Sequence, residues 1–182
     1  MEIQVLETSR LILRPLCFDD APQIQNKFPH WEIVKYLGAQ VPWPYPGDGA
    51  EQFIRDVVLP ARAAGRAWHW SIRPKSNAQE LIGVISLMDK ADENRGFWLA
   101  KDWQGQGLMT EAANCITDYW LDVLGKPLMR IPKAIENLPS RKISEQSNMR
   151  VVDVIQKELV CGICTSEVWE ITKDEWHGYR AS

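Results

Sequence analysis

The feature that most constrains the fold is a glycine pair between a strand-like segment and an amphipathic helix. Gly105 and Gly107 follow the apolar run 96–100 and precede a helical pattern that begins at Leu108. Glycine is a poor helix former, so its use here needs a reason. The first N–H groups of a helix lack partners and carry the positive end of its dipole, which suits phosphate. We therefore interpret the loop as a pyrophosphate-binding turn, where glycine lets the backbone approach the ligand.

This loop does not match the two best-known nucleotide-binding motifs. No lysine follows it, as GxxxxGK[ST] requires, and the third glycine of the dinucleotide pattern GxGxxG is missing. The strands before the loop also look antiparallel. A glycine pair before a helix can be a tight turn without a ligand, and this alternative stays open.

The rest of the chain is typical of one mixed domain, residues 1–182, without repeats or linkers. We expect strands at about 10–16, 68–72, 81–88, 96–100, 128–135, 151–160 and 167–172. We expect helices at about 19–28, 49–64, 108–124 and 137–148. Strand 68–72 should place Trp68, Trp70 and Ile72 on one face. Helix 49–64 should carry its apolar face on Phe53, Val57 and Ala61.

Composition narrows the classes of partner. Apolar residues make up 45% and charged residues 25%, with a net charge of −3, so nothing indicates binding to nucleic acid or to a membrane surface. No apolar run reaches the roughly 18 residues of a membrane span, and the N-terminus does not resemble a signal peptide. The four cysteines are sparse, which favours the cytoplasm. Cys161 and Cys164 form a CxxC that we expect to be a reduced hairpin turn, although a redox pair or half of a zinc site stays open.

Several motifs together resemble the GNAT N-acetyltransferases, and in particular the Rim branch, which includes the ribosomal-protein N-terminal alanine acetyltransferases. QGQG at 104–107 resembles the family's Q/R-x-x-G-x-G/A loop, which holds the pyrophosphate of coenzyme A. GFWLAKDWQGQGLMTEA at 96–112, NLPSRKISE at 137–145 and TSRLILRPL at 8–16 resemble the matching segments of that branch. The resemblance covers nearly the whole chain.

The resemblance implies a fold and a co-substrate. The fold is α+β, with a splayed, mostly antiparallel sheet of about six to seven strands and about four helices. Acetyl-CoA is the implied co-substrate, without a metal, with its pantetheine between strand 96–101 and the strand near 129–135. The cofactor-binding residues expected on this basis are Leu99, Ala100, Gln104, Gly105, Gln106, Gly107, Leu108, Met109, Thr110, Asn137 and Ser140.

The resemblance also implies direct attack of a primary amine on the thioester. Ser140, or Ser144 where many members have tyrosine, is a candidate to protonate the departing sulfur, although Ser140 can equally cap its helix. The glutamate that is usual in the branch falls at Asn94, so the base is open. Glu93 is our candidate; further candidates are Asp89, His69, His30 and a water chain.

The amine pocket is expected to be aromatic, because the chain contains nine tryptophans. By family geometry we expect Trp31, Trp43, Tyr45 and Trp70 to line it. The amine itself, a protein N-terminus or a small molecule, is open, as is the choice between monomer and homodimer. Three other functions also stay open: a non-catalytic acyl-CoA-binding module, an acyltransferase that uses another donor such as succinyl-CoA, and a nucleotide-phosphate binder.

Overall fold

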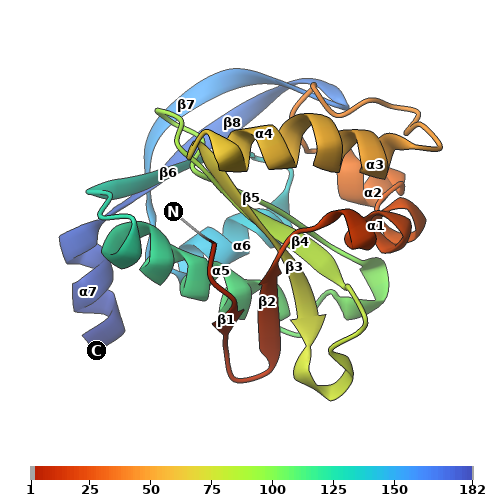
Figure 1. The fold of residues 1–182 in the computed structure, drawn as a ribbon. Coiled ribbons are helices and arrows are strands. Elements are labelled where there is room, and N and C mark those ends of the chain that lie inside the picture. The colour runs from red at the N-terminus through yellow and green to blue at the C-terminus, as the bar shows by residue number, and fades with distance from the viewer. Residues whose placement is uncertain (1–2, 182) are drawn as a thin grey trace.

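The computed structural model describes residues 3–181 and contains two antiparallel sheets (Figure 1). The larger sheet has the order β1-β2-β3-β4-β5, with β1 (Leu6–Glu7), β2 (Leu11–Pro15), β3 (Ala67–Pro74), β4 (Gly83–Met88) and β5 (Arg95–Leu99). The smaller sheet has the order β6-β8-β7, with β6 (Leu128–Ala134), β7 (Arg150–Leu159) and β8 (Gly162–Thr172). The predicted α+β class and the antiparallel pairing are confirmed, and Pro132 lies on an edge strand as expected.

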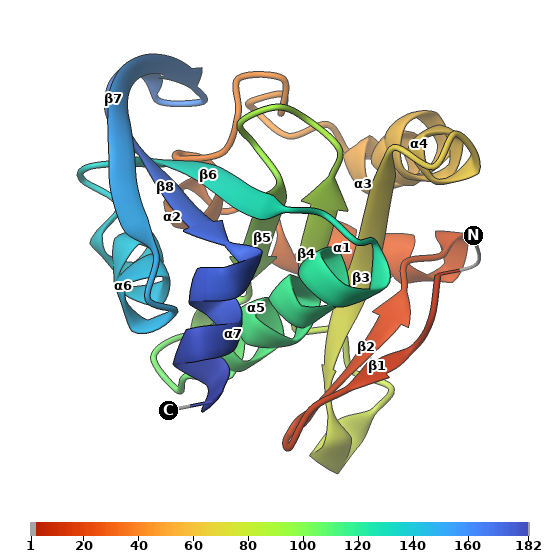
Figure 2. The same ribbon diagram turned by 90° about the vertical axis from the view of Figure 1, so that its left-hand side faces the viewer.

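Helices cover both faces of the sheets. They are α1 (Ala21–Lys27), α2 (Trp31–Val34), α3 (Gly49–Phe53), α4 (Leu59–Ala63), α5 (Leu108–Asp118), α6 (Leu138–Gln146) and α7 (Lys173–Ala181). A π-helical stretch, Ile54–Val58, joins α3 to α4, and a second one, Tyr119–Val123, extends α5. Figure 2 shows α5, α6 and α7 on one side of the sheets and α1, α3 and α4 on the other. No helix within residues 3–181 is long and apolar enough to cross a membrane.

The core forms two clusters, one on each face of the larger sheet. Trp68, Trp70 and Ile72 share the face that packs against α5, as the alternation in β3 predicts. Val84 and Trp98 belong to the other cluster, which packs against α1 and α3. Coverage on both faces explains why β3 is buried along its whole length.

Two predictions about helices were incomplete. The apolar face of helix 49–64 is not the buried one: Ile54 and Val58 are fully buried, whereas Val57 is 49% exposed. Helix α7 was not predicted at all. Its start carries a capping box, in which Glu175 accepts from the Thr172 N–H at 2.8 Å and Thr172 Oγ1 accepts from the Glu175 N–H at 3.3 Å. This T-x-x-E spacing was a readable signal.

Candidate active site

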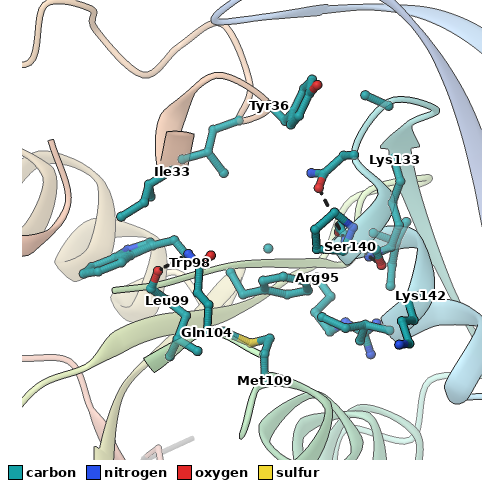
Figure 3. A pocket seen from close by; sticks show the side chains of 18 of the residues that line it. Ile33, Tyr36, Arg95, Trp98, Leu99, Gln104, Met109, Lys133, Ser140 and Lys142 are labelled. Atoms are coloured by element: carbon teal, nitrogen blue, oxygen red, sulfur yellow. Dashed lines mark hydrogen bonds between the residues drawn. The ribbon is translucent and has the colours of Figure 1, made fainter. Parts of the chain in front are cut away.

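β5 and β6 lie at the facing edges of the two sheets, and among the described residues hydrogen bonds join them at one end. The N–H of Asn94 donates to Arg130 O at 2.8 Å, and the N–H of Arg130 donates to Asn94 Oδ1 at 2.7 Å. Among the described strands, β5 pairs only with β4 and β6 only with β8. A cavity of about 670 Å³ therefore opens between the two strands beyond this apex (Figure 3). We call it the β5–β6 cleft.

The backbone of β5 presents polar groups to this cleft. The N–H of Ala100 donates to Ile82 O at 2.8 Å, which directs it toward β4. Because alternate residues of a strand direct their N–H groups to opposite edges, those of Phe97 and Leu99 face the cleft. An extended ligand in the cleft can therefore pair with Phe97 and Leu99, but not with the N–H of Ala100.

The glycine loop closes one end of the cleft. Gly105 and Gly107 have φ values of +76° and +74°, the left-handed region that favours glycine. A Cβ on Gly105 would meet nothing within 4 Å, so the space beside the loop is open to a ligand. Gly107 is the N-cap of α5 and offers no side chain to the first N–H groups of that helix. The helix N-terminus is thus available to an anion.

Arg10 holds this loop in place. Its Nη1 donates to Gln106 O at 3.0 Å, and its Nε donates to Glu111 Oε2 at 2.7 Å. Burial acts to raise the pKa of Glu111, but hydrogen bonds from Thr8 and Arg10 outweigh it and lower the pKa overall. A carboxylate on α5 thereby fixes a guanidinium beside the loop, which sequence reasoning missed because the partners lie about a hundred residues apart.

A second cavity of about 840 Å³ lies beside the first and shares part of its wall. Both cavities are lined by Leu37, Gly38, Glu93, Gly96, Phe97 and Trp98. The predicted apolar face of helix 49–64 lines this second cavity through Phe53, Val57 and Ala61, and of these three Phe53 also packs against the core. The two cavities therefore meet at β5, one carrying the anion-binding loop and the other an apolar wall.

A family model for the acetyltransferase (GNAT) domain matches residues 10–150, most of the chain and both walls of the cleft. The chain belongs to the GNAT acetyltransferases. Members of this family take their acetyl group from acetyl-CoA, and the cleft, the open glycine loop and the uncapped helix suit a long ligand with a pyrophosphate.

Solved GNAT structures resemble this one in fold. The ribosomal-protein-S5-alanine acetyltransferase from Vibrio fischeri has a TM-score of 0.79 at 15% identity, covering 96% of this chain and 99% of that one. A RimL ribosomal L7/L12 alpha-N-protein acetyltransferase in complex with coenzyme A has a TM-score of 0.77 at 18% identity, with coverage of 94% and 99%. Mycobacterium smegmatis RimJ in complex with CoA-disulfide has 0.79 at 17%, with coverage of 94% and 88%. No curated protein matches the chain at the sequence level.

Most of the expected cofactor-binding residues line the β5–β6 cleft. They are Leu99, Gln104, Gly105, Gly107, Leu108, Met109, Thr110, Asn137 and Ser140. Ala100 and Gln106 lie outside this lining. Two side chains already have partners, because Gln104 Nε2 donates to Leu99 O at 2.8 Å and Thr110 Oγ1 donates to Gln146 Oε1 at 3.2 Å.

The opposite wall comes from β6 and α6. Asn137 caps α6, its Oδ1 accepting from the Ser140 N–H at 3.4 Å. Ser140 faces the cleft and accepts two hydrogen bonds from Lys133, to Oγ at 2.7 Å and to O at 2.8 Å. Ser144 is fully buried outside the cleft lining, and its Oγ has no partner among the described residues. Of the two serines, Ser140 is therefore the one that the structure brings to the cleft.

The candidate bases are dispersed. Glu93 lines both cavities; burial acts to raise its pKa, but Lys157 at 2.8 Å and Lys90 at 3.1 Å outweigh it and lower the pKa overall. His69 lines the second cavity, and burial, helped by Arg62, lowers its pKa to about 4. Asp89 pairs with Lys126 at 2.7 Å at the rim of that cavity. His30 is exposed and precedes α2, outside both linings.

The aromatic residues predicted for the amine pocket divide in the structure. Tyr45 lines the second cavity, and burial raises its pKa to about 12. Trp31 and Trp43 pack together with ring centroids 5.7 Å apart, both exposed and outside the lining of either cavity. Trp70 is separated from the pocket, because β3 turns it toward α5, where its Nε1 donates to Gln4 O. Alternation placed Trp70 on the correct strand face but could not say which face carries the pocket.

The CxxC lies at the hairpin between β7 and β8, with Cys161 in the turn and Cys164 in β8. The two Sγ atoms lie 3.3 Å apart as free thiols. In residues 3–181, no three His, Cys, Asp or Glu side chains gather closely enough to hold a metal ion.

Proposed function

We propose that this GNAT protein transfers an acetyl group from acetyl-CoA to a primary amine by direct attack of the amine on the thioester. The observation that carries the proposal is the β5–β6 cleft, which ends at two left-handed glycines and a helix N-terminus without a side-chain cap. That arrangement suits a pantetheine paired with a strand edge and a pyrophosphate on backbone N–H groups.

Different residues of the cleft would bind different parts of acetyl-CoA. The N–H groups of Leu108, Met109 and Thr110 would hold the pyrophosphate, with Arg10 bracing the loop beneath it. Phe97 and Leu99 would pair with the pantetheine, and one of their N–H groups would steady the negative charge on the carbonyl oxygen during attack.

The second cavity supports the assignment of the amine side. It meets the cleft at Gly96, Phe97 and Trp98, so an amine there can reach a thioester threaded past β5. Its wall of Phe53, Val57 and Ala61 suits an acceptor with an apolar group next to its nitrogen, whether a protein N-terminus or a small molecule. Glu93 stands at the junction as a carboxylate, which can attract the ammonium and receive its proton through water.

One observation favours a second candidate, a non-catalytic acyl-CoA-binding module. The side chain of Asn94, at the position of the usual glutamate, is fully used in the apex of the cleft: it accepts from Arg130 and donates to Met88 O and Lys90 O. It cannot serve as a base. Under this alternative the protein binds acetyl-CoA but releases no thiol with any amine.

The test is thermal unfolding with acetyl-CoA, CoA, ATP and NAD in parallel, beside thiol release on a panel of peptides and small amines. A ligand that binds only the folded protein raises the melting temperature. We expect both CoA forms to raise it, ATP and NAD to leave it unchanged, and an amine on the panel to release thiol. A shift without thiol release would favour the binding module. No shift with either CoA form would contradict both candidates.

A further inference from the structure

Two buried basic side chains beside the cleft have no carboxylate partner among the described residues. Arg95 on β5 is 2% exposed and Lys133 on β6 is 5% exposed. Within residues 3–181, Arg95 donates to Thr117 Oγ1 at 2.9 Å and to the Ala113 carbonyl, and Lys133 donates only to Ser140. All of these acceptors are neutral. Neither takes part in an ion pair within the described chain. Since an unpaired buried charge is costly, this pair calls for an explanation.

Among the described residues, the charged group that acts on the pKa of the Lys133 amine is Arg95, which is also positive. Arg95 faces it from β5, and the Phe97 ring lies 5.0 Å from its Nζ. Its cross-strand partner on β8 is Glu167, but Arg141 occupies both oxygens of that carboxylate, at 2.9 and 3.2 Å. Burial and then repulsion from Arg95 lower the pKa of Lys133 well below its ordinary value.

We propose that Lys133 supplies, through the hydroxyl of Ser140, the proton that the departing thiolate needs. The inference rests on the proposed acetyl transfer and deepens it. Figure 3 shows Lys133 and Ser140 on one wall of the cleft, across from Leu99 and Gln104, which flank the path assigned to the pantetheine. Because Lys133 donates to Ser140 Oγ at 2.7 Å, the hydroxyl hydrogen of Ser140 is free to point into the cleft.

The proton balance closes without any further reactant. The amine nitrogen forms a bond to the acetyl carbon, and the C–S bond breaks with its electron pair on sulfur. The Ser140 hydroxyl gives a proton to that sulfur and takes one from the Lys133 ammonium. The attacking amine releases its proton to water. Lys133 then takes up a proton from water, so no net proton is gained or lost. Burial and repulsion from Arg95 lower the pKa of Lys133, so its ammonium gives up a proton more readily than that of an ordinary lysine.

The structure places only one of the two serines of α6 for this role. Ser144 is fully buried and does not line the cleft. Ser140 lies one helical turn earlier on α6, and it does line the cleft. A serine hydroxyl alone is a weak acid, so Lys133 behind it supplies the proton that Ser140 passes on.

The experiment compares the wild type with Lys133→Met, Ser140→Ala and Lys142→Met. Lys142 lines the same cleft from an exposed position and serves as the matched control. CoA affinity is measured by calorimetry, and the thiol of bound CoA is titrated by the ultraviolet absorbance of its thiolate. We expect the bound thiol of the wild type and Lys142→Met to ionise at lower pH than free CoA. We expect Lys133→Met and Ser140→Ala to lose that shift while still binding CoA.

Kinetics give an independent readout once an amine is known. Lys133→Met should lower kcat for transfer roughly 100-fold or more, with little change in the KM for acetyl-CoA, as general-acid contributions usually do. A variant that carries both Lys133→Met and Ser140→Ala should have a kcat no lower than that of the slower single variant, because the two residues act in one proton path. Ser140→Ala removes a single oxygen and tests the path if Lys133→Met does not fold.

The outcomes separate this inference from the function on which it rests. No binding of CoA by the wild type would contradict the proposed function. Tight CoA binding together with an unchanged thiol titration in both Lys133→Met and Ser140→Ala would overturn the role of Lys133 and leave the proposed function intact. Equal shifts in Lys142→Met and Lys133→Met would also overturn it, since the effect would then reflect only the general charge of the cleft.

Discussion

Asn94 and Arg130 join the two sheets at the apex of the cleft, through reciprocal hydrogen bonds of 2.8 Å and 2.7 Å. Asn94 is also 3% exposed, and its amide donates to two carbonyls of the β4–β5 turn. One side chain thus sets the point from which β5 and β6 diverge. Asn94 therefore has a structural role at the apex.

Asn94→Ala should destabilise the protein and loosen the cleft. It leaves the Arg130 N–H and the two carbonyls without their partner, which costs about 1–3 kcal/mol for a buried group. Urea unfolding should show this loss, and calorimetry should show weaker CoA binding. Asn26→Ala, at an exposed position in α1, is the control and should change neither. Equal stability of the two variants would contradict the role of the apex.

Gly107→Ala should be harmful for reasons of backbone conformation, not of space. At φ +74° an alanine costs roughly 1–2 kcal/mol, although its Cβ would meet only Arg10 Nη2 at 3.6 Å. We expect a lower unfolding midpoint in urea and weaker CoA binding as the loop shifts. Gly178→Ala in α7 is the opposite case, since its φ is ordinary and its Cβ meets nothing. Gly178→Ala should stabilise the helix by about 0.5–1 kcal/mol. A Gly107→Ala variant more stable than Gly178→Ala would contradict this account.

The parts of the fold that the sequence could predict are those with local causes. The left-handed backbone at Gly105, the cap at Asn137 and the positive φ of 57° at Asn148, at the end of the helix predicted for 137–148, follow from residue type and spacing. The role of Arg10 could not be predicted, because its partners Gln106 and Glu111 are distant in sequence. A lysine on a strand is ordinarily exposed, so nothing in the pattern marked Lys133 as buried.

Arg10→Gln should weaken CoA binding more than it weakens the fold. Arg10 is half exposed, so its ion pair with Glu111 contributes no more than about 1 kcal/mol to stability. Its guanidinium braces Gln106 O and adds positive charge beside the pyrophosphate loop. We expect a roughly tenfold loss of CoA affinity at low salt, shrinking at high salt. Arg55→Gln, which breaks the exposed pair with Asp56, should bind CoA normally. A tenfold loss there as well would show a general charge effect.

His69 should make the stability of the protein depend on pH in the acid range. Burial lowers its pKa from 6.5 to about 4, and its Nδ1 has no partner among the described residues. Because the unfolded chain binds this proton more readily, the stabilisation is complete above pH 6.5 and is lost as pH falls from there toward 4. At 1.36 kcal/mol for each pKa unit, the full loss is about 3 kcal/mol.

His69→Leu should remove this dependence, because leucine is neutral at every pH and suits the apolar contact with Phe53. The pH dependence is measured by urea unfolding at a series of pH values between 4 and 7, as the slope of the unfolding free energy against pH. His30→Gln is the control: that side chain is exposed, and its removal leaves the buried imidazole in place. It should keep the wild-type slope. A His69→Leu variant that also kept the slope would assign the acid sensitivity to other groups.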